Sequence, residues 1–313
     1  MPRKIHVYCG RESNKLASDV CRTLRIPRGK SKIKEFADLE PWFKIGDINE
    51  IDEDAIVAVI NSGANPVIKS NFDLWGLLYP INQRKPHRLV VVSPFYGFRR
   101  QERDVSGGEA VMSELMARFM VAAGATDIVV CDIHHLKILE DCTKAGLKPY
   151  NLDPDPLFLD QLRGRILTKW KVIRPDKGSE ERATRFSTAL NLPLVKVDKF
   201  HPDHEQTRIN EMNGDVRDCN LLFRDDELAT GGTVMATADA AEQQGAVGMT
   251  IMAAHGVLSG NAVHKIADRD FIQAVYITDS IYLPWEKRDE EKIHVLSLAP
   301  MIANTLLNIA EED

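Results

Sequence analysis

Two adjacent carboxylates, Asp225 and Asp226, stand just before a Thr-Gly-Gly-Thr segment that begins at Thr230 and ends at Thr233. Glycines let backbone amides approach an anion closely, and a helix that follows adds the positive end of its dipole. The two threonines can also donate hydroxyl hydrogen bonds to phosphate oxygens. The segment 225–233 is therefore predicted to hold a phosphate group.

The paired acids indicate a second kind of ligand group beside that phosphate. A carboxylate repels a phosphate, but it suits sugar hydroxyls or a hydrated magnesium ion. Because a sugar phosphate presents both kinds of group side by side, the loop from Asp225 to Thr233 is predicted to hold a phosphorylated ribose. The alternative is an ordinary strand-to-helix turn with solvated acids.

Short apolar runs recur between amphipathic stretches along the chain, as expected for parallel sheets covered on both faces. One series of strands is expected at 5–8, 55–60, 89–93 and 128–132, and a second at 171–174, 194–197, 220–224, 249–253, 274–278 and 293–298. Helices are expected at 109–123, 234–244 and 299–310. Alternation of strands and helices over the whole length predicts an α/β fold.

The chain is expected to have two related halves. Gly-Ala pairs at 124–125 and 245–246 each lead into a strand, and a proline-containing stretch at 147–156 lies between them. The expected domains are residues 1–148 and residues 149–298, with the last helix, 299–313, packing back on the first domain.

Composition restricts the classes of partner. With a net charge of −6, the chain lacks the general basic field that a nucleic-acid partner requires. Its longest apolar runs, such as 55–60, are too short to cross a bilayer, and its start has no signal-peptide pattern. The five cysteines are scattered without zinc spacing, so reduced thiols in a cytoplasmic protein are expected.

The segment Asp-Asp-x-x-x-Thr-Gly-Gly-Thr after an apolar strand resembles a signature shared by type I phosphoribosyltransferases and ribose-phosphate pyrophosphokinases. Further segments resemble the pyrophosphokinases: Phe-Ala-Asp-Leu-Glu at 36–40, Pro-Phe-Tyr-Gly-Phe-Arg-Arg-Gln-Glu-Arg at 94–103, Val-Cys-Asp-Ile-His at 130–134, Arg-Pro-Asp-Lys-Gly at 174–178 and His-Gly-Val-Leu-Ser-Gly-Asn-Ala at 255–262. Each segment alone is weak, but their ordered combination covers essentially the whole chain and is specific.

This resemblance implies two phosphoribosyltransferase-like domains, each a mostly parallel sheet flanked by helices, with the active site between them. It implies magnesium-dependent transfer of the diphosphoryl group of ATP to the 1-hydroxyl of ribose 5-phosphate, which gives phosphoribosyl pyrophosphate and AMP. It also implies a homodimer as the minimum unit, often assembled into a hexamer.

The resemblance also assigns roles to residues of this chain. ATP would be bound by Arg100 and Gln101, and by Phe36, Asp38 and Glu40 from a neighbouring subunit. Magnesium would be held by His134 and Asp176, and catalysis would involve Lys199, His134 and, in place of a flap arginine that this chain lacks, Arg208. The sugar phosphate would be bound by Asp225, Asp226, Ala229, Thr230, Gly231, Gly232 and Thr233.

Several positions depart from the family pattern. His201 stands where an arginine is common, Ala229 replaces an acid of bacterial relatives, and Arg224 and Glu227 replace apolar residues. The last three are expected to alter the floor of the sugar site, so a ribose with a larger 5-substituent, such as ADP-ribose, is an alternative acceptor. A further alternative is a regulatory subunit without activity, although the retained Lys199 argues against it.

The segment 104–109, Asp-Val-Ser-Gly-Gly-Glu, stands where relatives carry a basic segment that is linked to regulation by phosphate. Glycines cannot supply that charge. Weak or absent activation by inorganic phosphate is therefore predicted.

Overall fold

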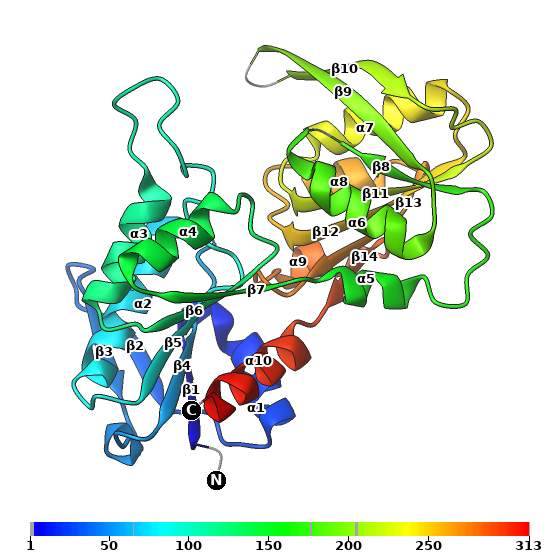
Figure 1. Cartoon of the computed structure of the whole chain (residues 1–313). Helices are drawn as coiled ribbons and strands as arrows, with labels where there is room; N and C mark the ends of the chain where they lie inside the picture. Colours follow the sequence, from blue (N-terminus) through cyan, green and yellow to red (C-terminus); the bar gives the residue numbers. More distant parts are fainter. Residues whose placement is uncertain (1–2, 65, 176, 204–205, 313) are drawn as a thin grey trace. The chain divides into compact units, whose positions relative to one another are not determined.

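The computed structural model describes residues 3–64, 66–175, 177–203 and 206–312. The chain forms two compact units (Figure 1). Unit 1 comprises Met1–Asp153, Ser280–Tyr282 and Ser297–Asp313, and unit 2 comprises Pro154–Asp279 and Leu283–Leu296. The chain therefore leaves unit 1, builds unit 2 and returns to unit 1 for its last helix.

Unit 1 contains a parallel five-stranded sheet in the order β1-β4-β5-β6-β7. Its strands are β1 (Ile5–Cys9), β4 (Ile56–Ile60), β5 (Arg88–Val92), β6 (Asp127–Cys131) and β7 (Lys148–Leu152). Every residue of β4 and β6 is buried, as expected for strands covered on both faces.

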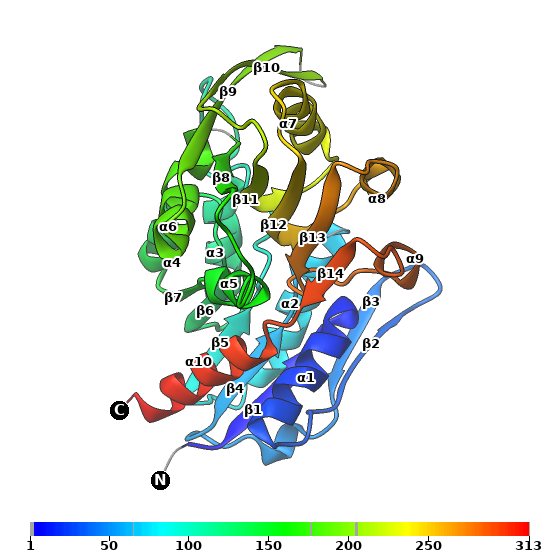
Figure 2. The same ribbon diagram turned by 90° about the vertical axis from the view of Figure 1, so that its right-hand side faces the viewer.

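Helices and a hairpin complete unit 1. The helices are η1 (Arg11–Ser13), α1 (Asn14–Leu24), η2 (Ile48–Glu50), α2 (Val67–Asn82), α3 (Met112–Ala122), α4 (Lys137–Ala145) and α10 (Ala299–Glu311). Strands β2 (Ser31–Glu35) and β3 (Pro41–Ile45) form the antiparallel hairpin. Helix α10 packs against α1 and β4, as Figure 2 shows.

Unit 2 contains a seven-stranded sheet in the order β10-β9-β8-β11-β12-β13-β14, parallel except for the β9–β10 pair. Its strands are β8 (Trp170–Arg174), β9 (Leu194–Asp203), β10 (Gln206–Asn213), β11 (Asn220–Leu228), β12 (Gly248–Gly256), β13 (Ile272–Thr278) and β14 (Ile293–Leu296). Its helices are α5 (Asp155–Gln161), η3 (Lys177–Ser179), α6 (Glu180–Leu190), α7 (Gly232–Gln243), α8 (Ala262–Ala267) and α9 (Trp285–Arg288). Both sheets confirm the predicted α/β class.

The two faces of the unit 2 sheet have separate hydrophobic cores. Phe223 of β11 packs on one face with Val234 of α7, whereas Leu222 packs on the other face with Phe158 of α5 and Phe186 of α6. Because side chains alternate along a strand, this arrangement fixes the faces of the residues that follow on β11.

Several predicted boundaries were wrong, and two of them concern segments next to the candidate site. Strand β11 does not end at Arg224 but continues to Leu228, because its backbone stays paired with β12 through Glu227↔His255 and Leu228↔Gly256. The paired acids therefore belong to the strand and not to a loop. Helix α3 begins at Met112 and not at Glu109, because Glu109 belongs to the preceding turn.

All five cysteines are free and buried, in agreement with the expected reduced thiols. Burial raises the pKa of Cys142 to about 12 and that of Cys21 to about 11, which keeps both thiols protonated near neutral pH. Within the described ranges, none of the helices combines the length and the apolarity that a membrane crossing requires.

Candidate active site

The turn between β11 and α7 has the features of an anion-binding turn. Gly231 adopts a left-handed conformation with φ of 77° at the N-cap of α7, and no side chain caps this helix. A Cβ at this position would lie 3.9 Å from its nearest neighbour, so backbone conformation rather than space favours glycine there. Among the described residues, the Gly231 amide has no hydrogen-bond partner.

This turn is held in place by the loop that follows β12. The amide of Leu258 donates to the Leu228 carbonyl at 2.9 Å, and the amide of Ser259 donates to the Ala229 carbonyl at 3.0 Å. These bonds use carbonyl groups of the turn and leave its amides to other partners. Thr230 is exposed at the tip of the turn. A fixed turn at the positive end of a 12-residue helix can therefore bind phosphate oxygens.

Asp225 and Asp226 lie in different environments. Asp225 is half-buried on the α7 side of the sheet, and its Oδ1 accepts a hydrogen bond from the Asp226 amide at 2.9 Å. Asp226 is buried on the opposite side, where its Oδ1 lies 3.6 Å from Nη1 of Arg182 on α6. Asp225 is therefore the more accessible of the two carboxylates for a sugar hydroxyl.

Arg224, which was expected to alter the floor of the sugar site, lies buried inside unit 2. Its side chain is completely buried, its Nε donates to Oδ1 of Asp155 at 2.7 Å, and its guanidinium lies 5.0 Å from the ring centroid of Phe158. Asp155 Oδ2 also accepts from Nε of Arg185 at 2.9 Å. The alternation along β11 directs Arg224 toward α5, so this residue connects the strand to that helix.

Arg182, Asp155 and Arg185 were missed by the reading of the sequence. Charged residues on short helices normally face water, and no local pattern distinguishes these three from solvated ones. Three buried arginines, Arg174, Arg182 and Arg224, lie near the carboxyl ends of β8 and β11. Arg224, at the end of the apolar run 220–224, was the one indication in the sequence of a buried ion pair, because an unpaired charge within a buried strand would be costly.

In unit 1, the segment after β5 has a fixed backbone and two exposed polar side chains. Arg100 and Gln101 are exposed, while the Gln101 amide donates to the Phe98 carbonyl at 2.9 Å. The neighbouring Arg99 is buried, and its guanidinium lies 4.8 Å from the ring centroid of Phe95. Arg99 therefore holds the segment against the interior of unit 1, and Arg100 is exposed to solvent.

His134 is exposed two residues beyond Asp132, which follows β6 with a φ of 42°. The Asp132 amide donates to the Leu152 carbonyl at 3.0 Å, so the backbone that carries His134 is tied to β7. Asp176, its expected metal-binding companion, lies outside the described residues. Over the described residues, no group of three or more His, Cys, Asp or Glu side chains is arranged to hold a metal.

A magnesium ion needs fewer protein ligands than that, since it keeps several waters and binds substrate phosphates. An exposed imidazole leaves room for such a hydrated ion. The donor at His134 is therefore compatible with magnesium carried by a phosphate ligand.

The segment 36–40 forms the tip of the β2–β3 hairpin. The Phe36 amide donates to the Glu40 carbonyl at 2.9 Å, and the Glu40 amide donates to Oδ1 of Asp38 at 3.2 Å. The Phe36 side chain is 56% exposed, and both acids are exposed. Phe36 is therefore not a core residue of this chain.

Lys199 and Arg208 lie on the β9–β10 hairpin. Arg208 pairs with Phe200, and Ile209 pairs with Lys199. The two basic residues thus occupy neighbouring rows of one antiparallel ladder, while their side chains lie outside the described part of the structure.

The turn at 104–109 is closed by its own acids. Oδ1 of Asp104 accepts from the Gly107 amide at 2.6 Å, and its Oδ2 accepts from the Gly108 amide at 2.7 Å. These backbone hydrogen bonds, that of Gly108 first, hold the pKa of Asp104 below its usual value. Glu109 Oε1 accepts from the Ser106 hydroxyl at 2.6 Å. The turn therefore carries negative charge.

Comparisons with known proteins agree with this architecture. The model of the N-terminal domain of ribose phosphate pyrophosphokinase matches residues 5–124, and that of the phosphoribosyl synthetase-associated domain matches residues 179–313. The ribose-phosphate pyrophosphokinase of Caldanaerobacter subterraneus subsp. tengcongensis is 32% identical, over 98% of this chain and 95% of the relative. That of Clostridium perfringens is 28% identical, over 99% and 96%.

The crystal structure of phosphoribosylpyrophosphate synthetase from Mycobacterium smegmatis shares the fold, with a TM-score of 0.88 at 24% identity. That match covers 99% of this chain and 100% of the other. The predicted resemblance is thus confirmed over nearly the whole length. The chain belongs to the ribose-phosphate pyrophosphokinase family of transferases.

Proposed function

We propose that this protein transfers the diphosphoryl group of ATP to the 1-hydroxyl of ribose 5-phosphate. The observation that carries the proposal is the uncapped turn at Gly231, fixed at the N-terminus of α7 and next to the half-buried carboxylate of Asp225. An anion site and a hydroxyl acceptor adjoin one another there, which is what a sugar phosphate requires.

On the sugar side, the amides and hydroxyls from Thr230 to Thr233 bind the 5-phosphate. Asp225 accepts hydrogen bonds from ribose hydroxyls, and Arg182 keeps Asp226 in position by an ion pair. Ala229 lies beside the phosphate and makes no side-chain hydrogen bond. The sugar is thereby oriented with its 1-hydroxyl free to react.

In the reaction, the 1-hydroxyl loses its proton to solvent as its oxygen bonds to the β-phosphorus of ATP. The bond from that phosphorus to the α,β-bridging oxygen breaks, and AMP leaves with that oxygen. Magnesium, held by His134 and Asp176, would neutralise charge on the phosphates. Lys199 and Arg208 supply positive charge from the β9–β10 hairpin to the transferred group. Arg100 and Gln101 bind the phosphates and base of ATP.

Phe36, Asp38 and Glu40 complete the ATP site of a neighbouring subunit in a homodimer or a larger assembly. The 56% exposure of Phe36 supports this proposal, because an aromatic ring at a hairpin tip is available for stacking on a purine. Mixing a Phe36→Ala protein with a Lys199→Ala protein tests it. Activity above that of either variant alone is expected if subunits exchange, and none is expected if each chain uses its own Phe36.

The acceptor is tested by incubating the protein with magnesium-ATP and either ribose 5-phosphate or ADP-ribose, and measuring AMP. AMP formation with ribose 5-phosphate alone is expected, because Arg224 is buried against Asp155 and is not available to contact a larger 5-substituent. AMP with ADP-ribose alone would assign the alternative acceptor. No AMP with either, while a control synthetase is active, would support a regulatory subunit.

Lys199→Ala tests the catalytic hairpin and should reduce the rate by at least ~10²-fold, because charge on the transferred group loses its stabilisation. Lys196→Ala is the matched control on the same strand. Its ammonium pairs with Glu180 at 2.9 Å on the surface, so its loss should change the rate little. Equal rates for the two variants would remove Lys199 from the mechanism.

A further inference from the structure

A cavity of about 480 Å³ opens in unit 2 at the amino-terminal edge of the sheet. Its walls come from the residues around the start of β8, from the turn after α6 and from the residues just before β11. The sugar-phosphate turn follows the other end of β11, roughly 26 Å away for a strand of this length. The cavity is therefore separate from the candidate active site.

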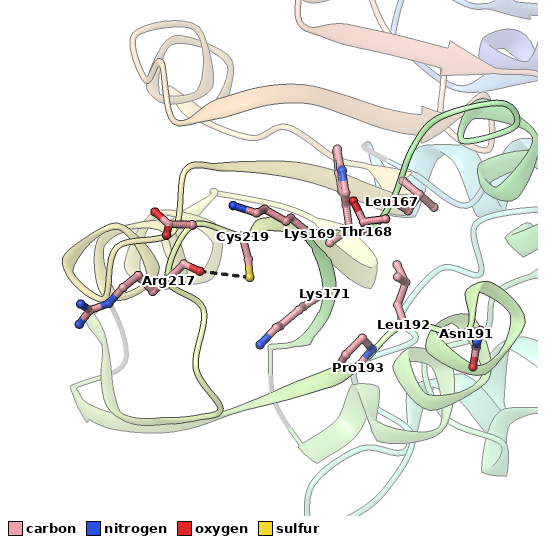
Figure 3. A pocket seen from close by; sticks show the side chains of 11 residues that line it. Leu167, Thr168, Lys169, Lys171, Asn191, Leu192, Pro193, Arg217 and Cys219 are labelled. Atoms are coloured by element: carbon pink, nitrogen blue, oxygen red, sulfur yellow. Dashed lines mark hydrogen bonds between the residues drawn. The ribbon is translucent and has the colours of Figure 1, made fainter.

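Three basic residues stand on one side of this cavity. Figure 3 shows Lys169, from the turn before β8, and Lys171, from β8 itself, extending to the same side, with Arg217 beyond them. The Lys171 ammonium donates to the Asp215 carbonyl, which is a neutral partner. In the described parts of the chain, neither Lys169 nor Arg217 has a carboxylate within 4.0 Å.

Several other basic residues of unit 2 do pair with acids. Arg269, for example, contacts both Asp239 and Glu242. Among the described residues that line the cavity, Asp218 supplies the one carboxylate. In a chain with a net charge of −6, the cavity is thus a local site of positive charge.

The opposite side of the cavity carries apolar side chains together with the neutral polar residues Thr168 and Asn191. Leu167, Leu192 and Pro193 lie there in Figure 3, across from the two lysines. Trp170, between Lys169 and Lys171 in the chain, projects to the other face of the strand and packs partly on the core there. The cavity therefore presents a cationic side and, across from it, an apolar wall of two leucines and a proline that is flanked by neutral polar groups.

We propose that this cavity binds a small phosphate monoester that carries an apolar ring or chain. Ammonium groups bind phosphate through charge-assisted hydrogen bonds, and an apolar wall covers the remainder of such a ligand. A purely apolar ligand would desolvate the ammonium groups without compensation, and a cation would be repelled by them. The proposal is independent of the proposed function.

The test uses phenyl phosphate as the probe and compares it with inorganic phosphate and with phenol, each of which carries one of its two groups. Each compound is titrated into the full-length protein, and its binding is measured by calorimetry. Phenyl phosphate is expected to bind more tightly than either half, and the binding should weaken as salt is added. Lys169→Glu is expected to weaken binding about tenfold or more, because a charged hydrogen bond becomes a repulsion.

Lys144→Glu, an exposed lysine on α4 that does not line the cavity, is the matched charge-reversal control and should leave binding unchanged. Lys171→Gln is the second variant, and circular dichroism checks that each protein is folded. Binding that is the same in Lys169→Glu, Lys171→Gln and the unmodified protein would overturn the proposal. Inorganic phosphate binding as tightly as phenyl phosphate would overturn the role of the apolar wall, and absence of any binding would overturn the site.

Discussion

Two turns of this protein contain a Gly-Gly pair, and they handle negative charge in opposite ways. At Gly107 and Gly108, both amides bind the carboxylate of Asp104, so the turn carries its own anion. At the second pair, the Gly231 amide has no hydrogen-bond partner among the described residues, and the Gly232 amide faces only the neutral Thr230 hydroxyl, at 3.5 Å. We therefore expect an external phosphate at a glycine pair only where the chain places no carboxylate within reach.

The position of the nearest acid explains this difference. Asp104 stands three residues before Gly107, the spacing at which a carboxylate can reach back to the amides of a turn. The residue three positions before Gly231 is Leu228, which is buried. Asp225 and Asp226 lie farther back on a paired strand, where they cannot close the turn.

The turn at Gly231 also follows a strand that contains a buried ion pair, and the largest predicted effect is on the stability that this pair provides. Arg224 lies buried in the strand that leads to the open turn and pairs with Asp155. Arg224→Leu should lower the free energy of unfolding by about 3 kcal/mol, because a buried carboxylate loses a partner. Urea unfolding measures this change.

The double variant Arg224→Leu/Asp155→Leu is the control for that prediction. Removal of both charges should recover part of the lost stability, although Arg185 then also loses its contact with Asp155. The single variant Asp155→Leu completes the comparison. If the loss of unfolding free energy in the double variant equals the sum of the losses in the two single variants, the pair is not coupled.

Matched substitutions at the two turns test their functions directly. Gly231→Ala and Gly107→Ala both place a Cβ at a φ near +80°, with values of 77° and 87°, and neither Cβ would clash. Gly231→Ala should reduce kcat/KM for ribose 5-phosphate by about 10²-fold, or ~2.7 kcal/mol, because the amides that bind phosphate shift.

Gly107→Ala should leave that rate within about twofold, because it introduces the same type of backbone strain in a turn to which the proposed function assigns no ligand. Steady-state kinetics with both substrates measures the two variants. Equal losses would mean that strain alone, and not phosphate binding, accounts for the effect of Gly231→Ala.

Asp104→Asn should open the closed turn without affecting the rest of unit 1. The amides of Gly107 and Gly108 lose their charged acceptor, so their hydrogen exchange, followed by NMR, should become faster. Slow exchange that persists in the variant would show that other contacts hold the turn.

The same turn should respond to pH. The pKa of Asp104 is lowered in the folded protein. The stability that its carboxylate gives to the turn is therefore fully present above the usual aspartate pKa, and it is lost as pH falls through the lowered value. The NMR chemical shifts of the Gly107 and Gly108 amides should therefore change only at acidic pH.

The smallest effect is predicted for inorganic phosphate as an activator. Because the turn at 104–109 holds acids and glycines bound to one another, it has no basic group to attract phosphate. Rates with and without phosphate should agree, and a strong requirement for phosphate would contradict the prediction.

The sequence was sufficient to predict the features that depend on local patterns. The β-branched runs at 55–60 and 89–93 coincide closely with β4 and β5, and the parallel α/β class is confirmed. The turn of Thr230 to Thr233 also precedes a helix as predicted, because glycine and dipole effects are local.

Features that depend on distant partners could not be predicted. Strand β11 continues beyond Arg224 because β12 pairs with it, and Arg224 is buried because α5 supplies Asp155. The β2–β3 hairpin was also missed; both of its strands are short, and one of them contains a proline. For β11 and Arg224, contacts between segments far apart in the sequence decide the structure.

The return of the chain to unit 1 has a consequence for synthesis on the ribosome. Helix α10 buries Ile302, Leu306 and Ile309 in unit 1, where it packs against α1 and β4 near the beginning of the chain. The face of α1 that it covers stays open until residues 299–311 have left the exit tunnel. Unit 2, which is made without interruption over most of its length, can fold first, and nascent unit 1 is the part that needs protection from aggregation.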